Sequence, residues 1–152
     1  MITEFIIILS SIFLSAFFSG MEIAFVSANK MHIELEKKKD TFLATILTRL
    51  TLKPSKYITT MLVGNNIALV IYGYFMGDVL MQAFGLNFQN EFLLLLTQTF
   101  ISTIIILVTA EFMPKAVFRI YANETLKIFA IPAYCFYLLF YLLSQFIILI
   151  SD

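Results

Sequence analysis

Four long apolar stretches, at about residues 2–28, 57–84, 92–118 and 126–150, make up most of this 152-residue sequence. Crossing the ~30 Å hydrocarbon core of a bilayer takes ~20 mostly apolar residues in a helix, and each stretch is long enough. Hydrophobic residues form 61% of the chain and charged residues only 13%, a composition outside the range of soluble globular domains. The sequence therefore predicts an all-α integral membrane protein.

The basic residues are unevenly distributed and predict an orientation. None of the ten Lys and Arg residues lies before Lys30 or in the segment 85–91. By the positive-inside rule, residues 29–56 and 115–127 face the cytoplasm, while the N-terminus lies outside. We expect a multi-pass protein of the cell membrane, in a bacterium the inner membrane, with three crossings at 2–28, 57–84 and 92–118.

Residues 29–56 alternate apolar and charged side chains, which predicts two short cytoplasmic helices at the membrane interface. Basic and acidic residues are mixed here, so the pattern indicates contact with membrane lipids and no nucleic-acid partner. The last stretch, 126–150, is ambiguous. Hydropathy allows a fourth crossing, but Pro132 and several tyrosines also suit a juxtamembrane or re-entrant helix, and the sequence pattern leaves both open.

Polar side chains interrupt the three predicted spans. They are Ser15, Ser19 and Glu22 in the first span, Asn65 and Asn66 in the second, and Thr109 and Glu111 in the third. The spacings i,i+4 and i,i+3 place the first three on one helical face. A carboxylate at the bilayer centre costs ~2.5–3.5 kcal/mol even on lenient scales, so an intramembrane acid indicates a functional site.

These side chains offer oxygen atoms, and the single cysteine and single histidine lie elsewhere. Oxygen ligands suit a hard cation such as Mg²⁺ or Ca²⁺, whereas zinc prefers thiolate or imidazole. Pro114 has no N–H to donate to the carbonyl of Ala110 four residues earlier, so that carbonyl becomes a candidate ligand. Broken helices that offer such carbonyls at mid-membrane are typical of transporters.

Three motifs carry a resemblance to a known family. Residues 17–24 (FFSGMEIA), 64–66 (GNN) and 111–115 (EFMPK) resemble, in order and spacing, the transmembrane domain of the CNNM/CorC magnesium transporters, many of which carry a haemolysin label. The resemblance covers nearly the whole chain. It implies a homodimer with three crossings per protomer, short cytoplasmic helices, and a juxtamembrane helix in 126–150 that leads to cytosolic CBS domains, which we expect to be absent from these 152 residues.

The same resemblance implies Mg²⁺ export, in exchange for Na⁺, through a dehydrated ion site. Its ligands would come from Ser15, Ser19, Asn65 or Asn66, Glu111 and a backbone carbonyl near Ala110. The residues that support the site or break its helices would be Gly20, Glu22, Gly64, Pro114 and Lys115. Two residues depart from the family pattern, because Ala110 stands where a glycine is usual and Leu69 where many members have an asparagine.

Simpler roles remain open for each polar residue. These roles are an i,i+4 pair of Glu111 with Lys115, packing of Glu22 against a neighbouring helix, and hydrogen bonds of the two asparagines that bridge helices. A non-transporting membrane anchor or Mg²⁺ sensor for a cytosolic domain is the alternative function. We expect no enzyme, since His-Glu-x-x-His and Gly-x-Ser-x-Gly patterns are absent from the sequence.

Overall fold

The computed structural model describes residues 2–85 and 89–151. The described residues fold into helices without a strand, which confirms the all-α prediction. Three helices are long and apolar enough to cross a membrane, namely α1 (Ile2–Ser27), α4 (Pro54–Phe84) and a composite third helix over Glu91–Ile120. The third helix consists of α5 (Glu91–Ile106), a π-helical segment η1 (Leu107–Phe112) and α6 (Met113–Ile120).

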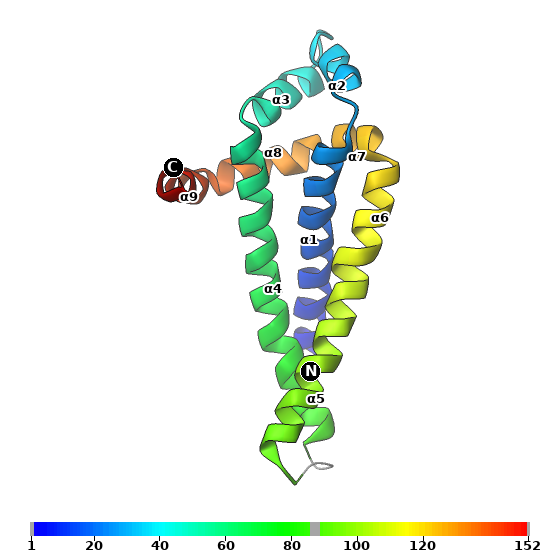
Figure 1. The fold of residues 1–152 in the computed structure, drawn as a ribbon, viewed down its shortest axis with the longest axis vertical. Coiled ribbons are helices and arrows are strands. Elements are labelled where there is room, and N and C mark those ends of the chain that lie inside the picture. The colour runs from blue at the N-terminus through cyan, green and yellow to red at the C-terminus, as the bar shows by residue number, and fades with distance from the viewer. Residues whose placement is uncertain (1, 86–88, 152) are drawn as a thin grey trace.

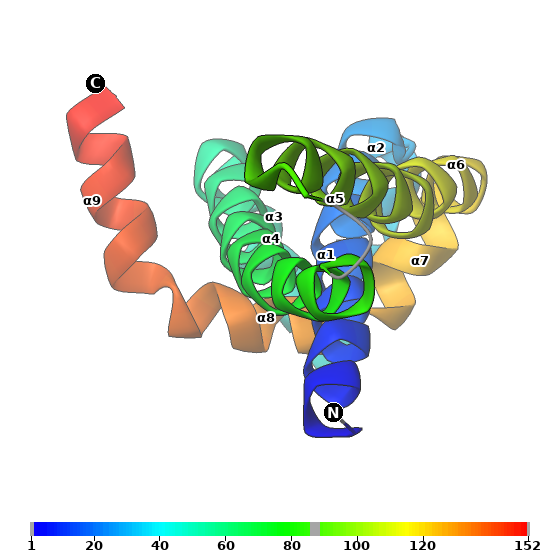
Figure 2. The same ribbon diagram turned by 90° about the horizontal axis from the view of Figure 1, so that it is seen from below.

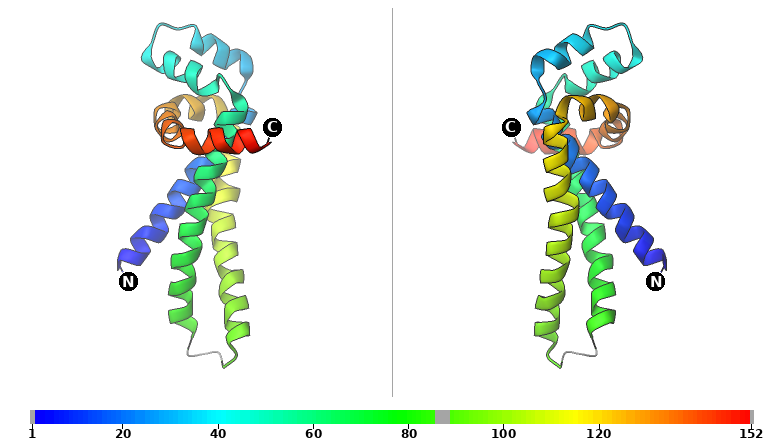
Figure 3. Two further views of the ribbon diagram at one scale, coloured as in Figure 1. Left: turned by 90° about the vertical axis from the view of Figure 1, so that its left-hand side faces the viewer. Right: turned by 90° about the vertical axis from the view of Figure 1, so that its right-hand side faces the viewer.

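The three long helices run lengthwise through the molecule (Figure 1). Helix α4 and the third helix stay side by side, while the N-terminal half of α1 diverges from both (Figure 3). The diverging half of α1 exposes large apolar side chains, among them Ile2, Leu9 and Phe13. In a bilayer such side chains face lipid, so the divergence does not expose them to water.

Two short helices, α2 (Lys30–Lys37) and α3 (Phe42–Thr51), connect α1 to α4 at one end of the bundle, the α2–α3 end (Figure 1). Each begins at a side-chain cap. Asn29 accepts hydrogen bonds from the backbone N–H groups of Met31 and His32, and Thr41 accepts one from Ala44. The cap at Asn29 separates α2 from α1, and the cap at Thr41 starts α3 after α2, so the chain forms two short helices within 29–56.

The ambiguous stretch 126–150 folds as parts of three short helices rather than one. They are α7 (Ala122–Ile128), α8 (Ala130–Leu139) and α9 (Tyr141–Ser151). Helix α8 runs across the long helices at the α2–α3 end, and α9 bends away from it (Figures 1 and 2). None of these three helices reaches the length of a membrane span. The ammonium group of Lys56, near the start of α4, lies 3.2 Å from the ring centre of Tyr141 and thereby joins α9 to the bundle.

Buried apolar side chains form two clusters. The large cluster lies at the α2–α3 end and joins α1, α2, α3, α4, α7 and α8 around residues such as Phe18, Met21, Leu47 and Tyr57. The small cluster lies further along the bundle and consists of Ile8, Tyr72, Ile106 and Ala110. The polar residues predicted to form a site lie between and beside these two clusters.

Candidate functional site

Ser15 of α1 and Asn65 of α4 meet inside the bundle. The Ser15 hydroxyl donates a hydrogen bond of 2.5 Å to Oδ1 of Asn65. Both side chains are buried, with 0% and 7% of their surface exposed. The contact brings together polar residues of the first and second predicted spans. It also shows that Asn65 forms a hydrogen bond between two helices, which is the simpler role considered for the asparagines.

Ser19 lies one turn further along the same face of α1. Its side chain is buried, and its Oγ has no hydrogen-bond partner among the described residues. A buried hydroxyl without a partner costs ~1–3 kcal/mol, so native structures rarely keep one without a reason. The site therefore contains an oxygen that is desolvated and available to a ligand.

The third helix changes its winding where the sequence predicted a break. Residues Leu107–Phe112 form a π-helix, and the N–H of Met113 donates to the carbonyl of Val108, five residues earlier. Pro114 follows directly and has no N–H for an α-helical bond to Ala110. The predicted break is therefore corrected to a widened turn, which keeps the helix continuous across the proline. π-Helical turns are frequent at functional sites.

Ala110 lies in this widened turn, fully buried in the small cluster. Ile12 and Leu69 pack against the same cluster. Ile12 is three residues from Ser15, and Leu69 is four residues from Asn65, so each lies about one helical turn from the site. The backbone of the π-helix thus approaches the two helices that carry Ser15 and Asn65, close to their level.

Glu111 lies apart from these residues. Its half-buried side chain lines an open cavity of about 420 Å³ together with Lys115 and Arg119. No ion pair joins Glu111 to Lys115 within residues 2–85 and 89–151. Glu111 therefore faces a cavity that basic side chains line, without the simple i,i+4 ion pair to Lys115, and its role as an ion ligand stays a prediction.

Asn66 and Glu22 are likewise not brought into the cluster. Asn66 is exposed, because the residue after Asn65 points to a different side of α4. Glu22 is half-buried on α1, and over the described part of the chain it makes neither a hydrogen bond nor an ion pair. Their roles as ligand or support stay predictions.

Gly20 and Gly64 do not break their helices, because α1 and α4 run through them without interruption. They provide close packing instead. A Cβ atom on Gly20 would lie 2.4 Å from the Phe118 ring, and one on Gly64 would lie 2.6 Å from the Phe18 ring. Each glycine therefore accommodates an aromatic ring of a neighbouring helix, and this fixes the distances between the helices that carry the site.

Several polar contacts near the site were not singled out from the sequence. Tyr57 donates a hydrogen bond of 2.9 Å to the carbonyl of Met21, and Tyr72 donates one of 2.8 Å to the carbonyl of Ser102. Gln98 and Ser102 are buried on α5. Gln98 and Ser102 are four residues apart and lie on one face of a mostly apolar helix. This spacing indicates that the face points inward, because polar side chains in a membrane span turn away from lipid.

The chemistry of the cluster is that of uncharged oxygen. In the part of the chain that the structure describes, no three His, Cys, Asp or Glu side chains come together as a metal site. A cation between α1 and α4 would meet two serine hydroxyls, one amide oxygen and nearby backbone carbonyls. Such ligands suit a hard cation of the Mg²⁺ or Ca²⁺ type and match none of the preferences of soft metals.

Comparisons with known proteins bear on the whole of this bundle. Residues 5–152 match the family described as the cyclin M transmembrane N-terminal domain, CNNM. The chain is also 30% identical over 151 residues to the UPF0053 protein MG146 of Mycoplasma genitalium, a match that covers 95% of this chain and 35% of the relative. The chain therefore spans about a third of the length of that curated relative.

Proposed function

The chain belongs to the cyclin M transmembrane N-terminal domain family, and we propose that it transports Mg²⁺ through a site between α1, α4 and the π-helix of the third helix. This is a family of membrane domains, generally linked to the transport of Mg²⁺ and other metals, rather than a family of enzymes. The proposal extends to export in exchange for Na⁺ by a homodimer, in a bacterial inner membrane with the N-terminus outside.

One observation carries the proposal. Ser19 Oγ is buried and without a partner, one turn from the buried pair of Ser15 and Asn65. In a protein that only anchored another domain, a mid-span hydroxyl of this kind would be replaced at no cost by an apolar group. A cation that sheds its water uses such oxygens as ligands, and its binding energy offsets their desolvation.

The geometry indicates how the site would take up an ion. Oδ1 of Asn65 accepts the Ser15 hydroxyl with one of its two lone pairs, and turning that hydrogen away would leave both lone pairs to an ion. The net contribution of such a hydrogen bond is ~0.5–1.5 kcal/mol, a small barrier to exchange for an ion–oxygen contact. Both oxygens would then face the cation together with Ser19.

The π-helix would bring in the negative charge. Each residue of an α-helix rotates by about 100° about the axis, so returning the widened turn to an α-helical register turns the preceding and following segments relative to each other. Such a change would carry Glu111 from its basic cavity toward α1. Glu111 would then alternate between two positions, one beside Lys115 and Arg119 and the other beside the bound cation. This alternation would couple ion occupancy to helix rotation.

The first test is calorimetric titration of purified protein in detergent with Mg²⁺, with Ca²⁺ and Na⁺ as competitors. Asn65→Ala should abolish saturable binding, whereas Asn66→Ala, its exposed neighbour, should keep it. Ser19→Ala should also abolish binding, yet its melting temperature should stay equal or rise, because the substitution removes an unpaired buried hydroxyl. Ser10→Ala, at an exposed serine of the same helix, is the matched control.

Flux distinguishes a transporter from an anchor or sensor. In liposomes that hold a Mg²⁺ indicator, the full-length protein should move Mg²⁺ at a rate that depends on an imposed Na⁺ gradient, and Glu111→Gln should abolish this flux. Saturable binding without flux would favour the sensor. Equal binding in Asn65→Ala and wild type would reject the proposed site.

A further inference from the structure

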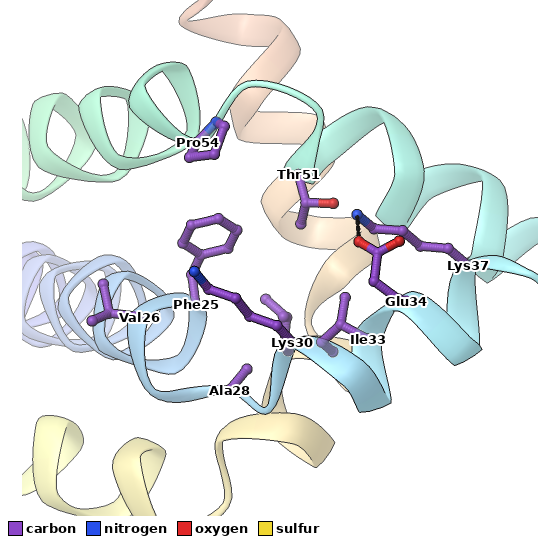
Figure 4. Close-up of a pocket in the computed structure, with 10 residues that line it drawn as sticks. Phe25, Val26, Ala28, Lys30, Ile33, Glu34, Lys37, Thr51 and Pro54 are labelled. Atoms are coloured by element: carbon purple, nitrogen blue, oxygen red, sulfur yellow. Dashed lines mark hydrogen bonds and ion pairs between the residues drawn. The ribbon is translucent and has the colours of Figure 1, made fainter.

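A second cavity, of about 380 Å³, lies at the α2–α3 end and away from the proposed ion site. Its walls come from the end of α1, from α2, and from the junction of α3 with α4 (Figure 4), and Leu126 of α7 also lines it. The cavity therefore lies where α1 ends and α4 begins, at the level where two predicted membrane spans leave the bilayer. Nothing in the transport proposal uses it.

One part of the cavity is apolar. Phe25, Ile33, Leu126 and Pro54 line it, and Ile33 and Leu126 also belong to the large buried cluster. A fully hydrated ion would gain nothing from these walls. An acyl chain or glycerol backbone would bury apolar surface against them, at roughly 25 cal/mol per Å².

The charged part of the cavity has an excess of positive charge. Lys37 and Glu34 form an ion pair of 3.0 Å and compensate each other. Lys30 forms no ion pair with any residue in the described ranges, and Figure 4 shows its side chain extending along the cavity with the amine beside Phe25. The remaining charge of the cavity is therefore that of Lys30.

The backbone adds to this positive potential. Lys30 is the first residue of α2, which has no acidic residue in its first turn, and α4 begins at Pro54 without a side-chain cap. Helix N-termini carry partial positive charge and normally favour acidic groups, so a lysine at this position is unfavourable without an external anion. An anion in the cavity would compensate the lysine and the partial positive charge at the start of α2.

We propose that this cavity binds the head group of an anionic phospholipid. The phosphate would contact Lys30, and the glycerol and upper acyl segments would lie against Phe25 and Ile33. A lipid fits better than a soluble phosphate compound, because the charge and the apolar wall occur together at the level of the bilayer surface. A bound lipid would connect α1, α2, α4 and α7 at their shared end. This inference does not depend on ion transport.

The test uses purified, delipidated full-length protein in detergent and measures its melting temperature during titration with short-chain phosphatidylglycerol. The temperature should rise and saturate with phosphatidylglycerol, and should not rise with zwitterionic phosphatidylcholine of the same chain length or with inorganic phosphate. Lys30→Gln should raise the concentration for half-maximal effect about fivefold, since one lysine near a membrane surface contributes about that factor.

Lys38→Gln is the matched control, because Lys38 is exposed, lies outside the cavity and carries the same charge. It should leave the titration unchanged. An equal loss in Lys38→Gln would show diffuse surface attraction, an equal effect of inorganic phosphate would show a soluble-anion site, and an equal effect of phosphatidylcholine would show no head-group selection. Each of these three results would overturn the proposal. Lys30→Arg should restore the wild-type response and would show that Lys30→Gln fails through lost charge.

Discussion

The large cluster at the α2–α3 end joins side chains of α1, α2, α3, α4, α7 and α8, whereas the small cluster joins single residues of α1, α4, α5 and η1. Aromatic rings interlock in the first, with Phe18 and Phe136 at a centroid distance of 4.9 Å. In the small cluster, Tyr72 is the one aromatic residue among the buried members that lie in the described part of the chain. Figure 3 shows the consequence, since α1 remains with the bundle at one end and diverges at the other.

The two clusters indicate which end of the bundle is tightly packed and which end can move. Rigid packing is costly to rearrange, while a region with few buried contacts opens at low free energy. The candidate ion site lies at the boundary, with Ser19 beside the large cluster and Ala110 within the small one. An ion pathway that opens alternately needs such a boundary between a fixed and a movable part.

The largest expected effect breaks the packing of the fixed end. Gly20→Ala places a Cβ 2.4 Å from the Phe118 ring, which itself stacks on Phe129. The rings must shift, and overpacking of this kind costs ~1–3 kcal/mol. Gly73→Ala is the control, because apart from its own stretch of helix no described residue places an atom within 4 Å of its Cβ position, and alanine is the better helix former. Thermal unfolding in detergent should show a lower midpoint for Gly20→Ala alone.

The next effect concerns the attachment of α8 and α9 to the same end. Lys56 is 3% exposed, and its ammonium group lies 3.2 Å from the Tyr141 ring centre and 5.5 Å from that of Tyr137. Lys56→Met keeps the aliphatic stem but removes a cation–π contribution of ~1–2 kcal/mol. Hydrogen exchange should become faster in α9.

The exposed neighbour of this lysine provides the control for α9. Lys53→Met should leave exchange in α9 at the wild-type rate, because Lys53 is exposed and lies outside the two ring contacts. Equal acceleration in both variants would show that overall positive charge, rather than the contact with Tyr141, holds α9.

A matched pair of tyrosines compares the two clusters directly. Tyr57→Phe removes the hydrogen bond to the Met21 carbonyl in the large cluster, and Tyr72→Phe removes the one to the Ser102 carbonyl in the small cluster. Each bond contributes ~1 kcal/mol. Because the large cluster joins six helices, Tyr57→Phe should lower the global unfolding midpoint, whereas Tyr72→Phe should accelerate hydrogen exchange chiefly in α5. The same global effect from both variants would contradict the division into two regions.

The smallest expected effect lies at the surface. Glu36 bonds to Lys39 at 2.9 Å and to Lys127 of α7 at 3.3 Å. The hydrogen bond from Lys39 is the main cause that holds the pKa of the Glu36 carboxyl below its usual range. A lowered folded-state pKa gives a contribution to stability that is present above the usual carboxyl range and is lost as pH falls through the lowered value.

Acid should lower the thermal unfolding midpoint partly by protonating Glu36 and weakening the contact between α2 and α7. Glu36→Gln should therefore reduce the difference between the unfolding midpoints measured at neutral pH and near pH ~4. Glu34→Gln is the comparison, because among the described residues Glu34 forms an ion pair with Lys37 of its own helix and with no residue of another helix. A change in acid sensitivity of the same size in both would show that the link to Lys127 contributes nothing specific.

Much of the fold follows from apolar length and polar interruptions. The runs at 2–28, 57–84 and 92–118 indicated membrane-spanning helices because a bilayer requires backbone hydrogen bonds to be satisfied within each span, and the structure has helices of that length there. The spacing of Ser15 and Ser19 placed both on one inward face, and both are buried. The motifs of residues 17–24, 64–66 and 111–115 pointed to the family that matches residues 5–152.

The helical class, the three spans, the family and the polar face of α1 could all be predicted from the sequence, because each depends on local composition and spacing. Which polar groups meet depends on the packing of the helices. It joined Ser15 to Asn65, left Asn66 exposed, and placed Glu111 beside Lys115 and Arg119. It also turned the predicted break before Pro114 into a π-helix, and divided 122–151 into three short helices. Such outcomes depend on helix rotation and on packing between distant residues, which no single span encodes.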